Sequence, residues 1–196
     1  TIDIYVLSYD YNSKLAHPTD LIKRNIKSYL SQFRILSDKV RILNGYIINF
    51  GVLFDVLAYP NFDKNIIKTR CIQAIQNHYQ TRTMQFKEIL YTSEITSLLT
   101  KIEGVKAIND VIFTQDKDWT DTEGFTPFNP PLYSKTINND GETIEINTGG
   151  YGHFYDFEQF FYHDTAPQGR GVVLPSVDPS VFEIKNPNTD IKGVVR

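Results

Sequence analysis

The segment VRILNGYIINFGVLFDVLAYP, residues 40–60, carries the clearest strand pattern in the sequence. From Tyr46 to Ala58 every even-numbered position is apolar, whereas the odd-numbered positions mix apolar and polar residues. Because successive side chains of a strand point to opposite faces, this alternation predicts a long strand with one fully buried face. The turn dipeptide Asn44-Gly45 predicts that residues 40–43 form a separate short strand or a kinked lead-in.

The residues before this segment predict a strand followed by a helix. Residues 2–9, IDIYVLSY, are β-branched, aromatic and largely apolar, which is typical of a buried strand. Pro18 and Thr19 are suitable first residues for a helix, and apolar side chains then recur at helical spacing as far as residue 33. The other side of this helix is basic; it could bind an anionic ligand, but a solvated surface is the favoured interpretation. Its basic residues are Lys23, Arg24 and Lys27.

Two helices and a strand are predicted after the long strand. Asp63 can cap a helix that runs through Tyr79. A third helix begins near Thr92, and Gly104 lies just past its end, where a left-handed residue is favoured. Residues 105–113 predict the last strand. The resulting order favours an α+β fold: a small mixed or antiparallel sheet covered by about three helices, loosely ferredoxin-like.

Composition changes abruptly near Thr114. Residues 1–113 carry 14 Lys and Arg against 10 Asp and Glu, a balance of +4, whereas residues 114–196 carry 6 against 13, a balance of −7. Seven of the nine prolines and eight of the eleven glycines also lie after residue 113. The change predicts an α+β domain of residues 1–113 and an acidic, aromatic, β-rich and turn-rich extension of residues 114–196 that makes subunit contacts. We expect residues 1–113 to fold without the remainder.

The composition also argues against several classes of protein. The single cysteine, Cys71, excludes an internal disulfide framework. A net charge of −3 and a pI near 5.8 argue against a nucleic-acid partner. No apolar run reaches the roughly 18 residues that a membrane span requires, and no signal-peptide pattern opens the chain, so we expect no membrane association and synthesis inside a cell.

No motif for nucleotide binding or hydrolysis occurs, and we expect neither enzymatic activity nor a cofactor. Cys71 could act as a nucleophile with His78 as its base. The two residues are seven apart on one helix face, about 10 Å along the axis, which is too far for a direct hydrogen bond. A buried core cysteine is therefore the favoured interpretation.

Two groups of polar residues could in principle bind a metal ion. In the first group the carboxylates and the histidines would lie on opposite faces of a strand, so a structural role is favoured. Its members are His153, Asp156, Glu158 and His163. The second group lacks the Gly at position six and the Glu at position twelve of a calcium loop, so an acidic linker is favoured and no metal is expected. Its members are Asp116, Asp118 and Asp121.

One feature of the second half stands out: seven of the twelve residues from 151 to 162 are aromatic. Leaving such a run exposed would cost about a few kcal/mol, and large exposed apolar patches usually mark contact surfaces. An interface with another subunit is favoured over a sugar-stacking platform, because tyrosine-rich surfaces are typical of interface anchors. The predicted interface residues are Tyr151, Phe154, Tyr155, Phe157, Phe160, Phe161 and Tyr162.

Four stretches of the sequence carry a family resemblance. They are HPTDLIKRNIKSYLSQFR at 17–34, YIINFGVLFDVL at 46–57, ILYTSEITSLLTKIEGVKAINDVIF at 89–113 and SVFEIKNPNTDIKG at 180–193. In pattern and order they resemble the baseplate J-like family, and within it the C-terminal part of the baseplate wedge proteins of T-even-like contractile-tailed phages. The resemblance covers most of residues 1–113 plus the terminal stretch, and no catalytic signature anchors it.

The resemblance implies a structural protein of the virion, located in the tail baseplate and assembled in the host cytoplasm. Family members are paired within each wedge and join neighbouring wedges into a ring around the hub, so the implied partners are other copies of the chain and other baseplate wedge proteins. It also implies that the protein has no active site. The alternative is a carbohydrate-binding or receptor-binding tail module that uses the aromatic cluster of residues 151–162.

Overall fold

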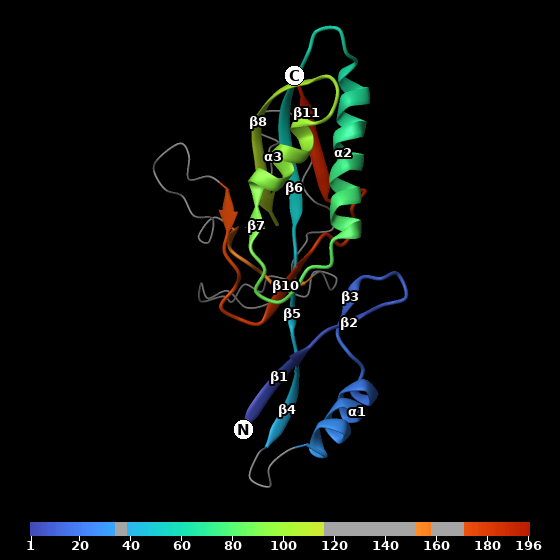
Figure 1. The fold of residues 1–196 in the computed structure, drawn as a ribbon, viewed down its shortest axis with the longest axis vertical. Coiled ribbons are helices and arrows are strands. Elements are labelled where there is room, and N and C mark those ends of the chain that lie inside the picture. Colours follow the sequence, from blue (N-terminus) through green and yellow to red (C-terminus); the bar gives the residue numbers. More distant parts are fainter. Residues whose placement is uncertain (34–38, 116–151, 158–170) are drawn as a thin grey trace, which may run out of the picture.

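The computed structural model describes residues 1–33, 39–115, 152–157 and 171–196, and everything below concerns these residues. Within them the protein has an α+β fold, with three helices and several small sheets arranged along one long axis. The N-terminus lies at one end of the molecule and the C-terminus at the other (Figure 1). The ferredoxin-like arrangement that the element order favoured is not confirmed by these pairings.

The segment with period-two alternation forms the axis of the molecule. It contains three consecutive strands, β4 (Val40–Asn44), β5 (Tyr46–Asn49) and β6 (Gly51–Ala58), which follow one another along the axis in Figure 1. Only Gly45 and Phe50 interrupt the strand assignment. Tyr46, at the start of the predicted buried face, is 39% exposed, but the face is confirmed from position 48 to position 56, where its residues are fully buried. They are Ile48, Phe50, Val52, Phe54 and Val56.

Each strand of this axis has a parallel partner. β1 (Ile2–Val6) pairs with β4, β10 (Ser180–Glu183) pairs with β5, and β11 (Ile191–Val195) pairs with β6. β8 (Val105–Thr114), which the sequence predicted as the last strand of the first half, pairs antiparallel with the other edge of β6. The axis therefore connects three sheets that would otherwise be separate.

These pairings correct the predicted domain boundary near Thr114. The prediction of a separate extension is wrong for residues 180–195, because their strands complete the sheets formed by residues 46–58. Composition could not reveal this, since an acidic, proline-rich stretch can still contain short strands whose partners lie far away in the sequence.

The three predicted helices are confirmed. α1 (Asp20–Ser31) begins after Thr19, whose hydroxyl caps Ile22 N–H, and α2 (Lys64–Thr81) begins after Asp63, whose carboxylate caps two backbone N–H groups. α3 (Thr92–Thr100) follows the short strand β7 (Leu90–Tyr91). α2 packs against β11 and α3 packs against β8, so both helices cover the sheet around β6. None of the described helices is long and apolar enough to cross a membrane.

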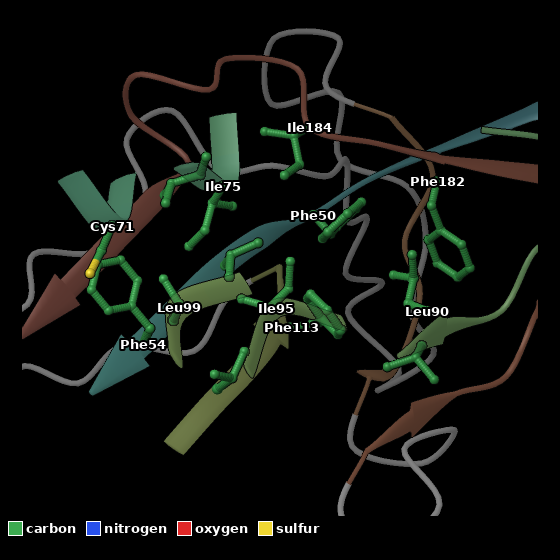
Figure 2. Close-up of a cluster of buried hydrophobic side chains, with 14 of the residues drawn as sticks. Phe50, Phe54, Cys71, Ile75, Leu90, Ile95, Leu99, Phe113, Phe182 and Ile184 are labelled. Carbon is green, nitrogen blue, oxygen red and sulfur yellow. The ribbon is translucent and has the colours of Figure 1, made fainter. Parts of the chain in front are cut away.

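The hydrophobic core lies between this sheet and the two helices that cover it (Figure 2). Phe50 is at its centre and makes edge-to-face contacts with Phe113 and Phe182, at centroid distances of 5.6 and 6.0 Å. Cys71 and Ile75 enter the core from α2. The core therefore combines residues from the first half of the chain with Phe182 from its end.

Gly104 confirms one prediction and corrects another. Its φ is +98°, the left-handed backbone that favours glycine, and an added Cβ would lie 2.9 Å from side-chain atoms of Ile67 and Phe62. However, α3 already ends at Thr100, so this glycine forms the turn into β8 rather than the helix cap.

The predicted strand of residues 2–9 is divided and is not buried. β1 ends at Val6, and β2 (Ser8–Tyr9) then forms a small antiparallel hairpin with β3 (Leu15–Ala16). Ile2 is 48% exposed and Tyr5 is 37% exposed. The apolar sequence indicated a strand correctly but could not indicate that little of the chain covers it. The short strand β9 (Val172–Val173) pairs antiparallel with β7.

Candidate interaction surfaces

Three of the seven predicted interface aromatics, Phe154, Tyr155 and Phe157, lie in the described segment 152–157. Tyr155 is 4% exposed and Phe157 is 6% exposed, and both contact Phe182, at centroid distances of 5.4 and 6.1 Å. These two rings thus belong to the chain's own core, contrary to the prediction that they contact another subunit. Phe154 is half-buried. Four predicted interface residues lie outside the described part: Tyr151, Phe160, Phe161 and Tyr162.

Gln115 holds this aromatic segment against the axis. Its side-chain N–H group donates to the carbonyls of Asn49 and His153 at 2.7 and 3.0 Å, and its side-chain oxygen accepts from Tyr155 N–H at 2.9 Å. Gln115 is 1% exposed, so these bonds satisfy a buried amide. Nothing in the sequence pattern around position 115 distinguishes this residue from a surface glutamine, so its role could not be predicted.

The residues considered for nucleophilic catalysis do not form a reactive site. Cys71 is fully buried, and desolvation raises the pKa of its thiol to about 11. His78 lies two turns further along α2, with its Nε2 atom 3.7 Å from Glu94 Oε2. Since the thiolate is the nucleophilic form of cysteine, a raised pKa makes this thiol inert.

We expect Cys71 to resist thiol reagents in the folded protein. Native labelling at pH 8 should be slow and limited by unfolding, because both burial and the raised pKa suppress the reactive thiolate. Labelling followed by mass spectrometry in increasing urea measures this, and modification should follow the unfolding transition. Fast labelling without urea would contradict the burial of Cys71.

The groups considered for metal binding are only partly described. His153 and Asp156 belong to segment 152–157, whereas Glu158 and His163 lie outside the described residues. The acidic group Asp116, Asp118 and Asp121 also lies outside them. Across the described ranges, no three potential ligands come together in a cluster that could hold a metal ion.

The N-terminal unit, comprising β1, α1 and β4, exposes several large apolar side chains. α1 packs against β4, yet none of its residues is buried. Leu21 is 64% exposed, Tyr29 is 62% exposed, and Phe33, just past the helix, is 70% exposed. Apolar residues on a helix normally face a core, so this exposed set indicates a contact surface.

The sheet of the N-terminal unit is also incomplete. β1 and β4 form a two-stranded parallel sheet, and no third strand joins it among the described residues. Parallel sheets occur almost exclusively where both faces are covered, and two strands alone are marginally stable in water. The unit therefore has an open strand edge as well as an exposed apolar helix face.

Charges on the N-terminal unit lie at its surface. Arg41 Nε and Nη2 donate to the two carboxylate oxygens of Asp3 at 2.6 and 2.5 Å, and this hydrogen bonding lowers the pKa of Asp3. Lys23, one of the three basic residues of α1, lies 3.7 Å from Asp20. Arg24 and Lys27 are exposed, whereas the side chain of Lys23 is 24% exposed.

A cavity of about 590 Å³ lies between the β2–β3 hairpin, the C-terminal end of α2 and the segment after β10. Its floor includes Glu183, which is 9% exposed. Glu183 Oε1 accepts from Leu15 N–H at 2.7 Å, and Oε2 lies 3.8 Å from Lys185 Nζ without a hydrogen bond. Burial raises the pKa of Glu183, opposed by the Leu15 hydrogen bond and by two lysines. The carboxylate of Glu183 thus connects the β2–β3 hairpin to β10, which is a structural role.

We expect Glu183→Gln to stabilise the protein more at pH 7 than at pH 4. An acid whose folded pKa is raised stabilises the folded state below its unfolded pKa, near 4.5, and this contribution is lost as the pH rises through the folded value. Glutamine keeps an oxygen for Leu15 N–H but carries no charge. Urea unfolding of both proteins from pH 4 to pH 8 measures the difference. An equal difference at both ends would show that Glu183 has an ordinary pKa.

Comparison with known proteins adds no assignment: no protein-family model matches the chain, and no curated protein matches it.

Proposed function

We propose that this protein is a structural subunit that assembles with other copies of itself through its N-terminal unit. The observation that carries the proposal is the exposed apolar surface of α1 beside an incomplete parallel sheet. A chain that functions as a monomer gains nothing from exposing an apolar helix face and an open sheet edge. In a subunit of an assembly, a neighbouring copy can cover both.

The setting that we propose for this assembly is the baseplate wedge of a contractile phage tail, within the virion. The support for this setting is the family resemblance of the sequence, with copies of the chain and other wedge proteins as partners. The inert, buried Cys71 is compatible with a role that requires no catalysis. For the alternative, a sugar-binding module, the described aromatics Tyr155 and Phe157 offer no platform because both are buried.

Light scattering of the purified chain at several concentrations tests self-association. We expect the mass to rise with concentration, and we expect Tyr29→Ser combined with Phe33→Ser to reduce that rise. Tyr11→Ser is the matched control, because Tyr11 is 95% exposed but lies in the turn between β2 and β3, outside the N-terminal unit. A monomeric mass at every concentration would contradict the proposed self-association.

A further inference from the structure

We propose that β1 pairs with β1 of a second copy, in antiparallel orientation and centred on Ile4. This inference rests on the proposed function and names the element through which two copies meet. It follows from three features of the N-terminal unit: the direction of the backbone groups of β1, the side on which α1 packs, and the charges along the strand.

The backbone groups of alternate residues in β1 point away from β4. Ile2 N–H donates to the carbonyl of Lys39 at 2.8 Å, and the carbonyl of Val6 accepts from Gly45 N–H at 3.0 Å. The backbone N–H and carbonyl groups of successive residues in a strand point to alternate edges. The backbone groups of Ile2, Ile4 and Val6 therefore point toward β4. Asp3 and Tyr5 therefore direct their N–H and carbonyl groups toward the open edge.

The helix leaves this edge accessible. α1 packs against β4, and within the described residues β1 has no strand partner other than β4. Figure 1 shows β1 on the side of the pair away from α1. An edge of this kind is a template for another strand, and nothing in β1 opposes such pairing, since it contains neither proline nor lysine.

The side chains of β1 are compatible with pairing to β1 of a second copy, and they favour one register. When two β1 strands pair antiparallel about Ile4, Asp3 of each copy faces Tyr5 of the other, and these are the residues whose backbone groups point outward. Centring on Asp3 would place two carboxylates opposite each other. Centring on Tyr5 would move Ile2 beyond the end of the strand, which is Val6. The register about Ile4 is the one that uses the whole edge without a charge conflict.

The product would be one sheet of four strands in the order β4, β1, β1, β4. Because the two-fold axis of an antiparallel pair is perpendicular to the sheet, both copies of α1 lie on the same face. A sheet of four strands with two helices on one face would be more stable than the two-stranded sheet of a single copy. The proposal thus explains why the N-terminal unit is incomplete in a single copy.

Cysteine cross-linking tests the register directly. In the proposed pair, the two Ile4 residues face each other as a non-hydrogen-bonded pair, whose Cα atoms are about 4.5 Å apart, within disulfide range. We expect Ile4→Cys to form a disulfide dimer under mild oxidation. Ile2→Cys is the matched control, because Ile2 faces Val6 of the other copy although it is well exposed. The double variant Ile2→Cys with Val6→Cys should again cross-link.

A backbone variant tests the hydrogen bonds. Tyr5→Pro removes the outward N–H group without touching the β1–β4 ladder, whereas Tyr5→Ala changes the side chain but keeps the N–H group. We expect the proline variant to raise the dimer dissociation constant about tenfold to a hundredfold relative to the alanine variant, because each copy loses a hydrogen bond. Light scattering measures both constants, and circular dichroism checks that each variant folds.

The outcomes separate this inference from the proposed function. Association that depends on Tyr29 and Phe33 but is equal in Tyr5→Pro and Tyr5→Ala would overturn the strand pairing and leave self-association standing. Equal cross-linking of Ile2→Cys and Ile4→Cys would overturn it as well. A monomer at every concentration would overturn both. If Tyr5→Pro does not fold, the comparison of the cysteine variants decides.

Discussion

A chain that ends at residue 113 is expected not to fold cooperatively. It lacks β11, the parallel partner of β6, and β10, the parallel partner of β5. Each of these two axis strands would therefore lose a row of backbone hydrogen bonds. It also lacks three rings of the core, Tyr155, Phe157 and Phe182, of which the last two contact Phe50. The expectation from composition alone was the reverse, an independently folded unit of residues 1–113.

Thermal unfolding followed by circular dichroism distinguishes the two expectations. The full chain should show one sigmoidal transition, whereas the truncated chain should show a broad, featureless loss of signal and should bind a hydrophobic dye. A chain that ends at residue 190 is the informative intermediate, because it lacks β11 alone. A sharp transition for residues 1–113 would restore the predicted boundary near Thr114.

Gly193→Ala is expected to destabilise the protein by about 3 kcal/mol, the upper end for overpacking a core. Gly193 lies in β11, where an added Cβ would be 2.0 Å from Cζ of Phe54. Phe54 is fully buried on the neighbouring strand, so its ring has no free space into which it can move. Glycine is required here because a ring occupies the volume of the missing side chain.

The control for this prediction is a double-mutant cycle. Phe54→Leu alone removes apolar contacts and should destabilise the protein, but it also makes room beside position 193. Gly193→Ala should therefore cost markedly less in the Phe54→Leu background, which urea unfolding at constant m-value measures. Equal costs in both backgrounds would mean that the ring of Phe54 is not the obstacle.

Local patterns predicted the elements of this fold well. The alternation of apolar residues predicted one buried face, and the structure confirms this face from Ile48 to Ala58. Thr19 and Asp63 marked the starts of two helices, because a capping side chain must lie next to the N–H groups that it satisfies. Strand alternation and helix caps can be predicted from sequence because the interacting residues lie within a few positions of each other.

Pairings between distant segments could not be predicted in the same way. Nothing in residues 191–195 indicates that they lie beside β6, since short apolar strands are compatible with many partners. For the same reason the apolar strand at residues 2–9 was expected to be buried, although whether a strand is covered depends on the rest of the molecule. The open edge of β1 therefore became visible only in the structure.

The aromatic run shows the same limit for the candidate site. Its density indicated that the rings must be buried, which holds for Tyr155 and Phe157. However, burial by a partner and burial by the chain's own core have identical sequence patterns. Tyr155 and Phe157 are buried by Phe50 and Phe182, which lie far away in the sequence in both directions. The surface that we propose for assembly instead belongs to α1 and β1.

The parallel pairing of β11 with β6 also determines when the protein can fold. Ile191 is the partner of Val52, so all the residues between them must be synthesised before this ladder can form. Ladders between such distant residues close slowly, because the loop between them loses conformational entropy first. During synthesis on the ribosome, β6 has β8 on one side but waits for β11 on the other. The nascent chain thus has an apolar, unpaired strand edge until residues 191–195 emerge, which is the interval in which it is most prone to aggregate.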